Sequence, residues 1–230
     1  ATLALTATSP LPKSAAEIDK LLGLAPEAEA TANMPSLEEF RANWPRFRGP
    51  DGGGVSALTN VLLSWDEKTG ADIVWKSPVP APGHSSPVVW SNRVLISGGD
   101  ATKREVFCFD ANDGKLLWQR ALENVPGSPA QQPEIPEMTG FASPTMASDG
   151  RRVFALFANG DLAALTLDGA PAWSKNIGVP KNTYGHAASL AIWPGKLIVQ
   201  FDQDEGAPGG SKLFAFDCAT GRLLRERSKP

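Results

Sequence analysis

Two histidines are the side chains of this sequence best suited to hold a ligand or a metal ion. His84 lies in Pro82-Gly83-His84-Ser85-Ser86, and His186 lies in Tyr184-Gly185-His186-Ala187-Ala188. Neutral imidazole is a common ligand, and each histidine directly precedes a short apolar segment that reads as a strand. The sequence therefore gives His84, His186 and Tyr184 as candidate ligand-binding residues. Hydrogen bonding to the loop backbone is the alternative role for each histidine.

An acidic loop is the second candidate site. Asp202, Asp204 and Glu205 lie in Phe201-Asp202-Gln203-Asp204-Glu205-Gly206. Closely spaced carboxylates can bind Ca²⁺ through their oxygen atoms, although this spacing does not complete an EF-hand loop. A solvated acidic hairpin is the alternative interpretation.

Other kinds of chemistry lack the residues they need. Cys108 and Cys218 form no Cys-x-x-Cys motif, so covalent haem and the common zinc sites are unsupported. No Gly-x-Ser-x-Gly nucleophile motif occurs, and Asp51-Gly52-Gly53-Gly54 lacks the Lys-Ser/Thr ending of a phosphate loop. The formal net charge of -3 gives no sign of a nucleic-acid-binding surface. No apolar stretch approaches the roughly 18 residues that span a bilayer.

A repeat supplies the elements that must position these side chains. Each copy contains an alternating strand, a turn with glycine and a short strand, at a period of 52 to 55 residues, and in the first two clear copies tryptophan lies four residues after the glycine. Asp168-Gly169 predicts a two-residue hairpin turn in which both residues have positive φ. A large ring at a fixed place in each unit is expected to act as a wedge between neighbouring sheets. The structural residues of the repeat are Gly114, Trp118, Gly169, Trp173 and Gly221.

Two further strands precede each turn, so every unit holds four short strands. They begin near Pro87, Pro144 and Leu190 and continue after Arg93, Arg152 and Lys196. Four antiparallel strands repeated at this period describe a propeller blade. The sequence predicts an all-β fold, a partial β-propeller of about three to four blades over residues 44–230. A looser copy precedes them, with Lys68-Thr69-Gly70 followed by Trp75, and Arg225 replaces the tryptophan in the last copy.

Residues 1–43 have a different composition and are expected to form a mostly irregular arm or linker. Residues 15–22 could form a short helix capped by Ser14, because Glu17 follows the serine at the capping-box spacing.

The segments Phe109-Asp110-Ala111-Asn112-Asp113-Gly114-Lys115-Leu116-Leu117-Trp118 and Phe216-Asp217-Cys218-Ala219-Thr220-Gly221 resemble the pyrroloquinoline-quinone-type propeller repeat, within the wider WD40/YVTN-like class. Asn43-Trp44-Pro45-Arg46-Phe47-Arg48-Gly49-Pro50 resembles the leading motif of secreted bacterial quinone-binding-like propellers, a group related to the outer-membrane-assembly lipoprotein propeller. Arg46 and Arg48 are expected to anchor this motif by pairing with carboxylates. The resemblance implies seven or eight blades, so we expect this chain to be part of a longer protein or to close with another copy.

The resemblance also sets the functional alternatives. A working quinoprotein dehydrogenase of this kind shows an adjacent Cys-Cys pair and a Ca²⁺ site, whereas Cys108 and Cys218 are far apart in the sequence. We therefore expect a non-catalytic, exported propeller that acts as a binding or assembly scaffold and needs no cofactor. A dehydrogenase of alcohols or sugars that uses pyrroloquinoline quinone with Ca²⁺ is one alternative, and a carbohydrate- or metal-binding module is another.

The expected partner is a protein or the remaining blades of the same propeller, with a small molecule or glycan as an alternative and no nucleic acid. The expected location is periplasmic or secreted, and an anchor upstream of residue 1 stays open.

Overall fold

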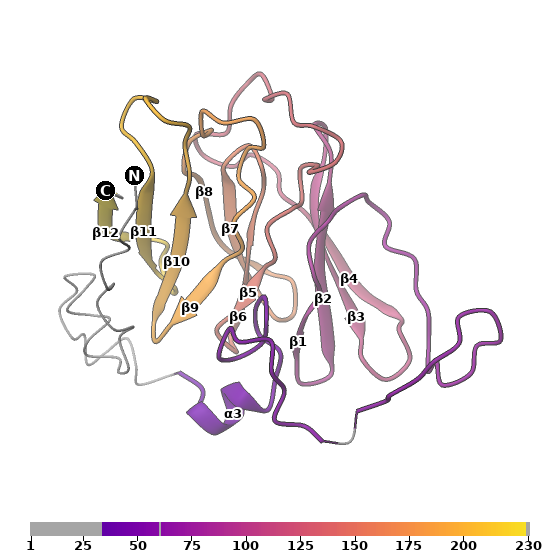
Figure 1. The fold of residues 1–230 in the computed structure, drawn as a ribbon. Coiled ribbons are helices and arrows are strands. Elements are labelled where there is room, and N and C mark those ends of the chain that lie inside the picture. The colour runs from indigo at the N-terminus through magenta and orange to yellow at the C-terminus, as the bar shows by residue number, and fades with distance from the viewer. Residues whose placement is uncertain (1–33, 60, 229–230) are drawn as a thin grey trace, which may run out of the picture.

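The computed structural model describes residues 34–59 and 61–228, which form three four-stranded antiparallel sheets in chain order (Figure 1). The first sheet contains β1 (Val88–Trp90), β2 (Arg93–Gly99), β3 (Arg104–Asp110) and β4 (Leu116–Ala121). The second contains β5 (Ala147–Ser148), β6 (Arg152–Leu156), β7 (Asp161–Thr166) and β8 (Pro171–Asn176). The third contains β9 (Ala191–Trp193), β10 (Lys196–Phe201), β11 (Lys212–Asp217) and β12 (Leu223–Ser228). The predicted partial propeller is confirmed, with three complete blades.

The turn between the third and fourth strands of a blade explains its glycine. In the first blade Gly114 (φ +71°) donates its N–H to the Asp110 carbonyl at 2.9 Å, and Asp110 donates to the Lys115 carbonyl at 2.8 Å. The Asp110 carboxylate accepts the N–H of Asn112 and so orders the turn. Only glycine adopts the left-handed conformation without steric cost, so the turn requires it.

The second blade corrects the prediction for its turn. Gly169 has a φ of +83° and donates to the Thr166 carbonyl at 2.9 Å, but Asp168 does not have a positive φ. The pairing of β7 with β8 shifts by one residue between Ala164 and Leu165. The other two blades have the same shift, so the difference lies in the turn itself. Thr166 donates to the Ala170 carbonyl at 2.8 Å across a loop of three residues, of which only Gly169 has a positive φ, in place of the predicted two-residue turn.

Each tryptophan of the repeat joins its blade to the following one. The Trp118 ring lies over Gly169 so closely that a Cβ atom at that glycine would be 2.7 Å from the ring. The indole N–H of Trp118 also donates to the Leu167 carbonyl at 3.0 Å. Trp173 makes the same contacts with Gly221 and the Cys218 carbonyl. The expected wedge is therefore present between the blades.

Two apolar cores fill the spaces between the three blades. Strand β6 contributes Val153 and Ala155 to the core with the first blade, and Phe154 and Leu156 to the core with the third. Adjacent side chains of a strand point to opposite faces, so both faces of β6 are buried. This explains why the middle strands are uniformly apolar rather than alternating.

Part of the N-terminal arm packs on the blades. Helix α3 (Leu37–Arg41) begins after Ser36, whose hydroxyl accepts the N–H of Glu39 at 3.0 Å. Phe40 lies 6.0 Å from the Trp90 ring and packs, with Met34, against the core between the second and third blades. The helix expected at residues 15–22 lies outside the described residues.

Candidate functional site

His186, a predicted ligand-binding residue, is buried within the fold. Only 3% of it is exposed, and its ring meets the Phe201 ring edge-on with centroids 5.1 Å apart. Nε2 lies 2.9 Å from the Gly178 carbonyl. Because a carbonyl only accepts hydrogen bonds, Nε2 carries the proton in this contact. Burial lowers the pKa of His186 to about 4, so the ring is neutral at pH 7.

His84 lies in a different environment. It is exposed, and its Nε2 is 3.3 Å from the Glu137 carbonyl. Its backbone N–H donates to the Ala142 carbonyl, whereas that of His186 donates to the Ala158 carbonyl. One imidazole is thus open to solvent and the other enclosed, and a site that uses both stays a prediction.

The acidic loop is hydrogen-bonded to the loop that carries Tyr184. Asp204 donates its backbone N–H to the Lys181 carbonyl at 3.0 Å, and the Asn182 side chain donates to the Asp202 carbonyl at 2.7 Å. The Asp202 carboxylate accepts a hydrogen bond from the Gln200 amide. Tyr184 is 51% exposed at the edge of this pair of loops. Across the described part of the chain, no group of three or more His, Cys, Asp or Glu side chains is placed to hold a metal ion. The Ca²⁺ site at Asp202, Asp204 and Glu205 therefore stays a prediction.

Both thiols are free and buried. Cys108 lies in β3 and Cys218 lies in the turn after β11, on different sheets. Burial raises the pKa of the Cys108 thiol to about 11, and it raises the pKa of the Cys218 thiol as well. A thiolate is the reactive form, so these are inert core residues.

A buried carboxylate joins the first two blades. Asp161 is fully buried, and its carboxylate accepts hydrogen bonds from the Asn159 amide at 2.8 Å, the Ser128 hydroxyl at 3.0 Å and the Asn176 amide at 2.9 Å. Arg104 of the first blade approaches it at 3.4 Å. Because its oxygens are used within the fold, this carboxylate has a structural role.

The leading segment, residues 43–54, crosses the inner edges of two blades. Trp44 pairs with Val89 of β1 in both directions, with N···O distances of 3.1 Å and 2.8 Å. One residue later, the Pro45 carbonyl accepts the N–H of Ser148 from β5 at 2.8 Å. The segment therefore ties the first blade to the second, near the end where α3 lies (Figure 1).

The residues of the motif also fix the shape of the leading segment. Gly49 has a φ of +76°, and a Cβ atom there would be 2.7 Å from the Trp44 ring. Arg46 donates to the carbonyls of Gly49 and Pro50 at 3.3 Å and 2.6 Å, and the guanidinium of Arg48 lies 5.9 Å from the centre of the Phe47 ring. Arg46 therefore anchors the segment through backbone carbonyls, which the tight loop turns toward its guanidinium, and the nearby Asp51 carboxylate adds an electrostatic interaction.

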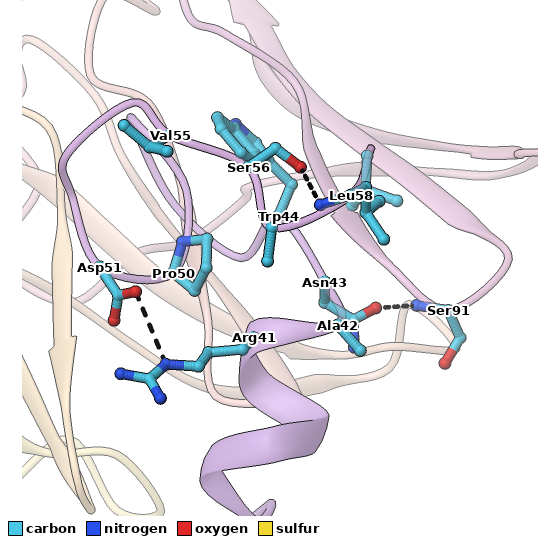
Figure 2. Close-up of a pocket in the computed structure, with 12 residues that line it drawn as sticks. Arg41, Ala42, Asn43, Trp44, Pro50, Asp51, Val55, Ser56, Leu58 and Ser91 are labelled. Atoms are coloured by element: carbon cyan, nitrogen blue, oxygen red, sulfur yellow. Dashed lines mark hydrogen bonds and ion pairs between the residues drawn. The ribbon is translucent and has the colours of Figure 1, made fainter. Parts of the chain in front are cut away.

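A hollow of about 490 Å³ lies between the leading segment and the residues that follow it (Figure 2). Trp44, Pro50, Val55 and Leu58 supply apolar surface, and Arg41 faces Asp51 with 3.6 Å between Nε and Oδ2. Both charged side chains are more than half exposed, so their pairing is weak and their charges stay open to solvent. The lining residues are Arg41, Ala42, Asn43, Trp44, Pro50, Asp51, Val55, Ser56, Ala57, Leu58, Val89 and Ser91.

This hollow was not among the sites predicted from the sequence. Its polar lining is largely committed to the fold, since the Asn43 side chain accepts the Ser91 N–H at 2.6 Å and Ser56 accepts that of Leu58 at 3.0 Å. The hollow is therefore suited to binding an apolar group rather than to proton transfer. The signal in the sequence was the pair of apolar residues Val55 and Leu58 directly after a glycine-rich turn.

No helix within residues 34–59 and 61–228 has the length and apolarity that crossing a bilayer requires.

Comparisons with known proteins were consistent with this architecture. The family model described as outer membrane protein assembly factor BamB matches residues 59–229. The comparison with curated proteins found no match. Among solved structures, BamB from Moraxella catarrhalis is 21% identical over 70% of this chain and 45% of that chain, with a TM-score of 0.48.

Two enzymes share the fold more closely in space. Quinohemoprotein alcohol dehydrogenase ADHIIG from Pseudomonas putida HK5 is 20% identical over 86% of this chain and 28% of that chain, with a TM-score of 0.54. The quinohemoprotein alcohol dehydrogenase from Comamonas testosteroni is 16% identical over 93% and 30%, with a TM-score of 0.53. The chain spans less than half the length of each of these three proteins, and identities this low show the fold alone. The family match covers most of the chain, which therefore belongs to the family described as outer membrane protein assembly factor BamB.

Proposed function

We propose that this chain forms part of a non-catalytic, exported β-propeller that acts as a binding or assembly scaffold for a protein partner. The observation that carries the proposal is the apolar hollow beside the leading segment. Val55 and Leu58, at its edge, are 77% and 60% exposed, and the Trp44 ring forms part of its wall. Clustered exposed apolar side chains with a polar rim are typical of surfaces that bind other proteins.

The family to which the chain belongs supports the proposed location and the proposed kind of partner. The matching family is named for an outer membrane assembly factor, which favours a periplasmic or secreted location and a protein partner. Function resides in sites rather than folds, so the partner must be identified by experiment.

The quinoprotein alternative fits the described residues poorly. The two thiols lie on different sheets, so they do not provide the adjacent cysteine pair that the resemblance implies for a working dehydrogenase. The test is to add pyrroloquinoline quinone and Ca²⁺ and to follow quinone absorbance, thermal stabilisation and dye-linked oxidation of alcohols and sugars. Saturable binding with turnover would refute the scaffold proposal.

The scaffold itself is tested by site-specific cross-linking. A photoreactive residue placed at Leu58 in the source cells should capture one protein, whereas the same residue at Met138, which is 77% exposed on a loop outside the hollow, should not. With that protein purified, Leu58→Asp should weaken its binding at least about tenfold, because a charge replaces a buried contact. Equal capture from both positions, or unchanged affinity, would count against the proposal. Soaking with glycans or Ca²⁺ tests the remaining alternatives at His84, His186 and Asp202.

A further inference from the structure

Asn159 and Gly160 form the one Asn-Gly pair in the sequence, and each of the other asparagines precedes a residue with a side chain. Asparagine is a thermolabile residue, and a following glycine leaves its amide most open to attack. The backbone nitrogen of the glycine forms a bond to Cγ of the asparagine, and the Cγ–Nδ2 bond breaks. Ammonia leaves with the proton of the backbone N–H. Water then opens the resulting succinimide ring to aspartate or isoaspartate.

The fold requires both residues of this pair. Gly160 has a φ of +88°, and a Cβ atom there would collide with the Gly178 carbonyl, so only glycine fits. Asn159 is fully buried, and its Oδ1 accepts the N–H of Asp161 at 3.1 Å. Its Nδ2 donates to the Asp161 carboxylate and to the Gln132 side-chain oxygen, both at 2.8 Å. An amide meets both demands because it accepts at one atom and donates at the other.

The folded turn holds both reacting groups away from the reaction. The N–H of Gly160, which must attack, donates to the Phe157 carbonyl at 2.9 Å. The amide of Asn159, which must leave, is held by its three hydrogen bonds, and the Asn159 carbonyl accepts a fourth from Asn176 at 2.9 Å. A buried group that reacts only after local opening is protected by the opening equilibrium. Deamidation is therefore expected only in chains in which this turn has opened.

The products do not fit the folded site. An aspartate at position 159 would place a carboxylate oxygen 2.8 Å from the Asp161 carboxylate, where the amide now donates a hydrogen bond. Two carboxylates at this distance repel each other. Arg104, 3.4 Å from Asp161, would supply one positive charge for two negative ones. Isoaspartate instead adds a carbon atom to the backbone of a turn whose conformation is fixed at Gly160. Either product therefore weakens the junction between the first two blades.

We propose that Asn159-Gly160 is a site of spontaneous deamidation that the folded chain protects and whose product permanently destabilises the fold. A chain that stays unfolded for long is modified, and after refolding it opens more often than before. The site thus keeps a chemical record of unfolding. This inference concerns the junction at Asp161 and does not depend on the proposed function or on the hollow.

The first test compares rates in the whole chain, incubated in mildly alkaline buffer with and without denaturing urea. Peptide mass spectrometry follows the replacement of amide by carboxyl at each asparagine. Asn124, which is exposed and precedes valine, is the internal reference. In urea Asn159 should deamidate faster than Asn124, and without urea its rate should fall by about 100-fold or more. Equal rates at Asn159 under both conditions, or a rate in urea no faster than at Asn124, would overturn the inference.

The second test measures the cost of the product. Asn159→Asp should raise the ratio of unfolded to folded chain, at one urea concentration, by about 100-fold or more, because it buries a charge without a partner. Asn124→Asp adds the same charge at an exposed position and should change the ratio less than about threefold. Equal stability of the two variants would contradict the proposal.

The natural chain gives the same measurement without a substitution, which decides the matter if Asn159→Asp does not fold. Chains aged in urea are diluted to the concentration at which half of the unmodified protein is folded, and the folded and unfolded fractions are separated by size. Modification at Asn159 should be concentrated in the unfolded fraction, whereas modification at Asn124 should be distributed evenly. An even distribution at Asn159 would overturn the inference.

Discussion

Gly169→Ala tests the contact that joins one blade to the next. Gly169 has a φ of +83°, and placing a side chain in the left-handed region costs about 1–2 kcal/mol. The new Cβ atom would also lie 2.7 Å from Cδ2 of Trp118, and such over-packing costs about 1–3 kcal/mol. We therefore expect the free energy of unfolding to fall by about 2–5 kcal/mol.

A matched control separates the two contributions. Gly206 has a φ of +77°, but nothing lies within 4 Å of a Cβ atom built there. Gly206→Ala should therefore cost only the backbone share, about 1–2 kcal/mol. In a Trp118→Ala background the ring is gone, so Gly169→Ala should also cost only that share.

Urea unfolding followed by circular dichroism measures all four variants, and hydrogen exchange shows whether the loss is confined to the first two blades. The reasoning is refuted if Gly169→Ala costs no more than Gly206→Ala, or if removing the Trp118 ring leaves its cost unchanged. Either result would mean that the ring does not press on the glycine.

Three further outcomes are expected. Asp161→Ala should lower the free energy of unfolding, measured in urea, by about 3–5 kcal/mol, because it leaves Arg104 and the other buried donors without their acceptor. Asp168→Ala removes the partner of Arg93 in an exposed ion pair and should cost less than about 1 kcal/mol. Equal costs for the two variants would contradict the structural role of Asp161. The unfolded His186 protonates near its ordinary pKa of 6.5 and the folded one only near 4, so its contribution is present above pH 6.5 and is lost as pH falls toward 4, by up to about 3 kcal/mol. Urea titrations at each pH should show this loss in His84→Gln but not in His186→Gln, and an identical pH profile in both variants would exclude burial as its cause. A thiol reagent at pH 8 should label Cys108 and Cys218 only after unfolding, and rapid labelling of the native chain would show that the thiols are accessible.

Local features of the fold could be predicted from the sequence because they depend on residues that are neighbours along the chain. Gly114 and Gly221 are needed where the turn takes a positive φ, and the aspartate four residues earlier accepts the N–H groups of the same turn. The exception is Asp168-Gly169, where the loop between Thr166 and Ala170 has three residues in place of the predicted two, and only Gly169 has a positive φ. The shift in strand pairing beside the turn is the same in all three blades, so it does not account for this difference.

The sites were less predictable because burial depends on what packs against a residue from elsewhere. His84 and His186 precede equivalent strands, yet Phe201 from the third blade encloses only His186. The hollow at Trp44 is built by pairing with Val89, which lies 45 positions later in the sequence. Neither arrangement produces a repeating residue pattern that can be recognised in the sequence.

The sequence by itself determined the repeat, its register and the residues that mark each blade, because turn conformation and strand alternation are local properties. Tertiary structure alone decided which blade receives each tryptophan: Trp75, Trp118 and Trp173 pack on the glycine of the following unit, not of their own. It also decided that Leu63 and Trp65, with the pattern of a buried strand, stand exposed. The physical reason is that burial belongs to the stacking of whole sheets, and a strand is covered only where its neighbouring strand is present.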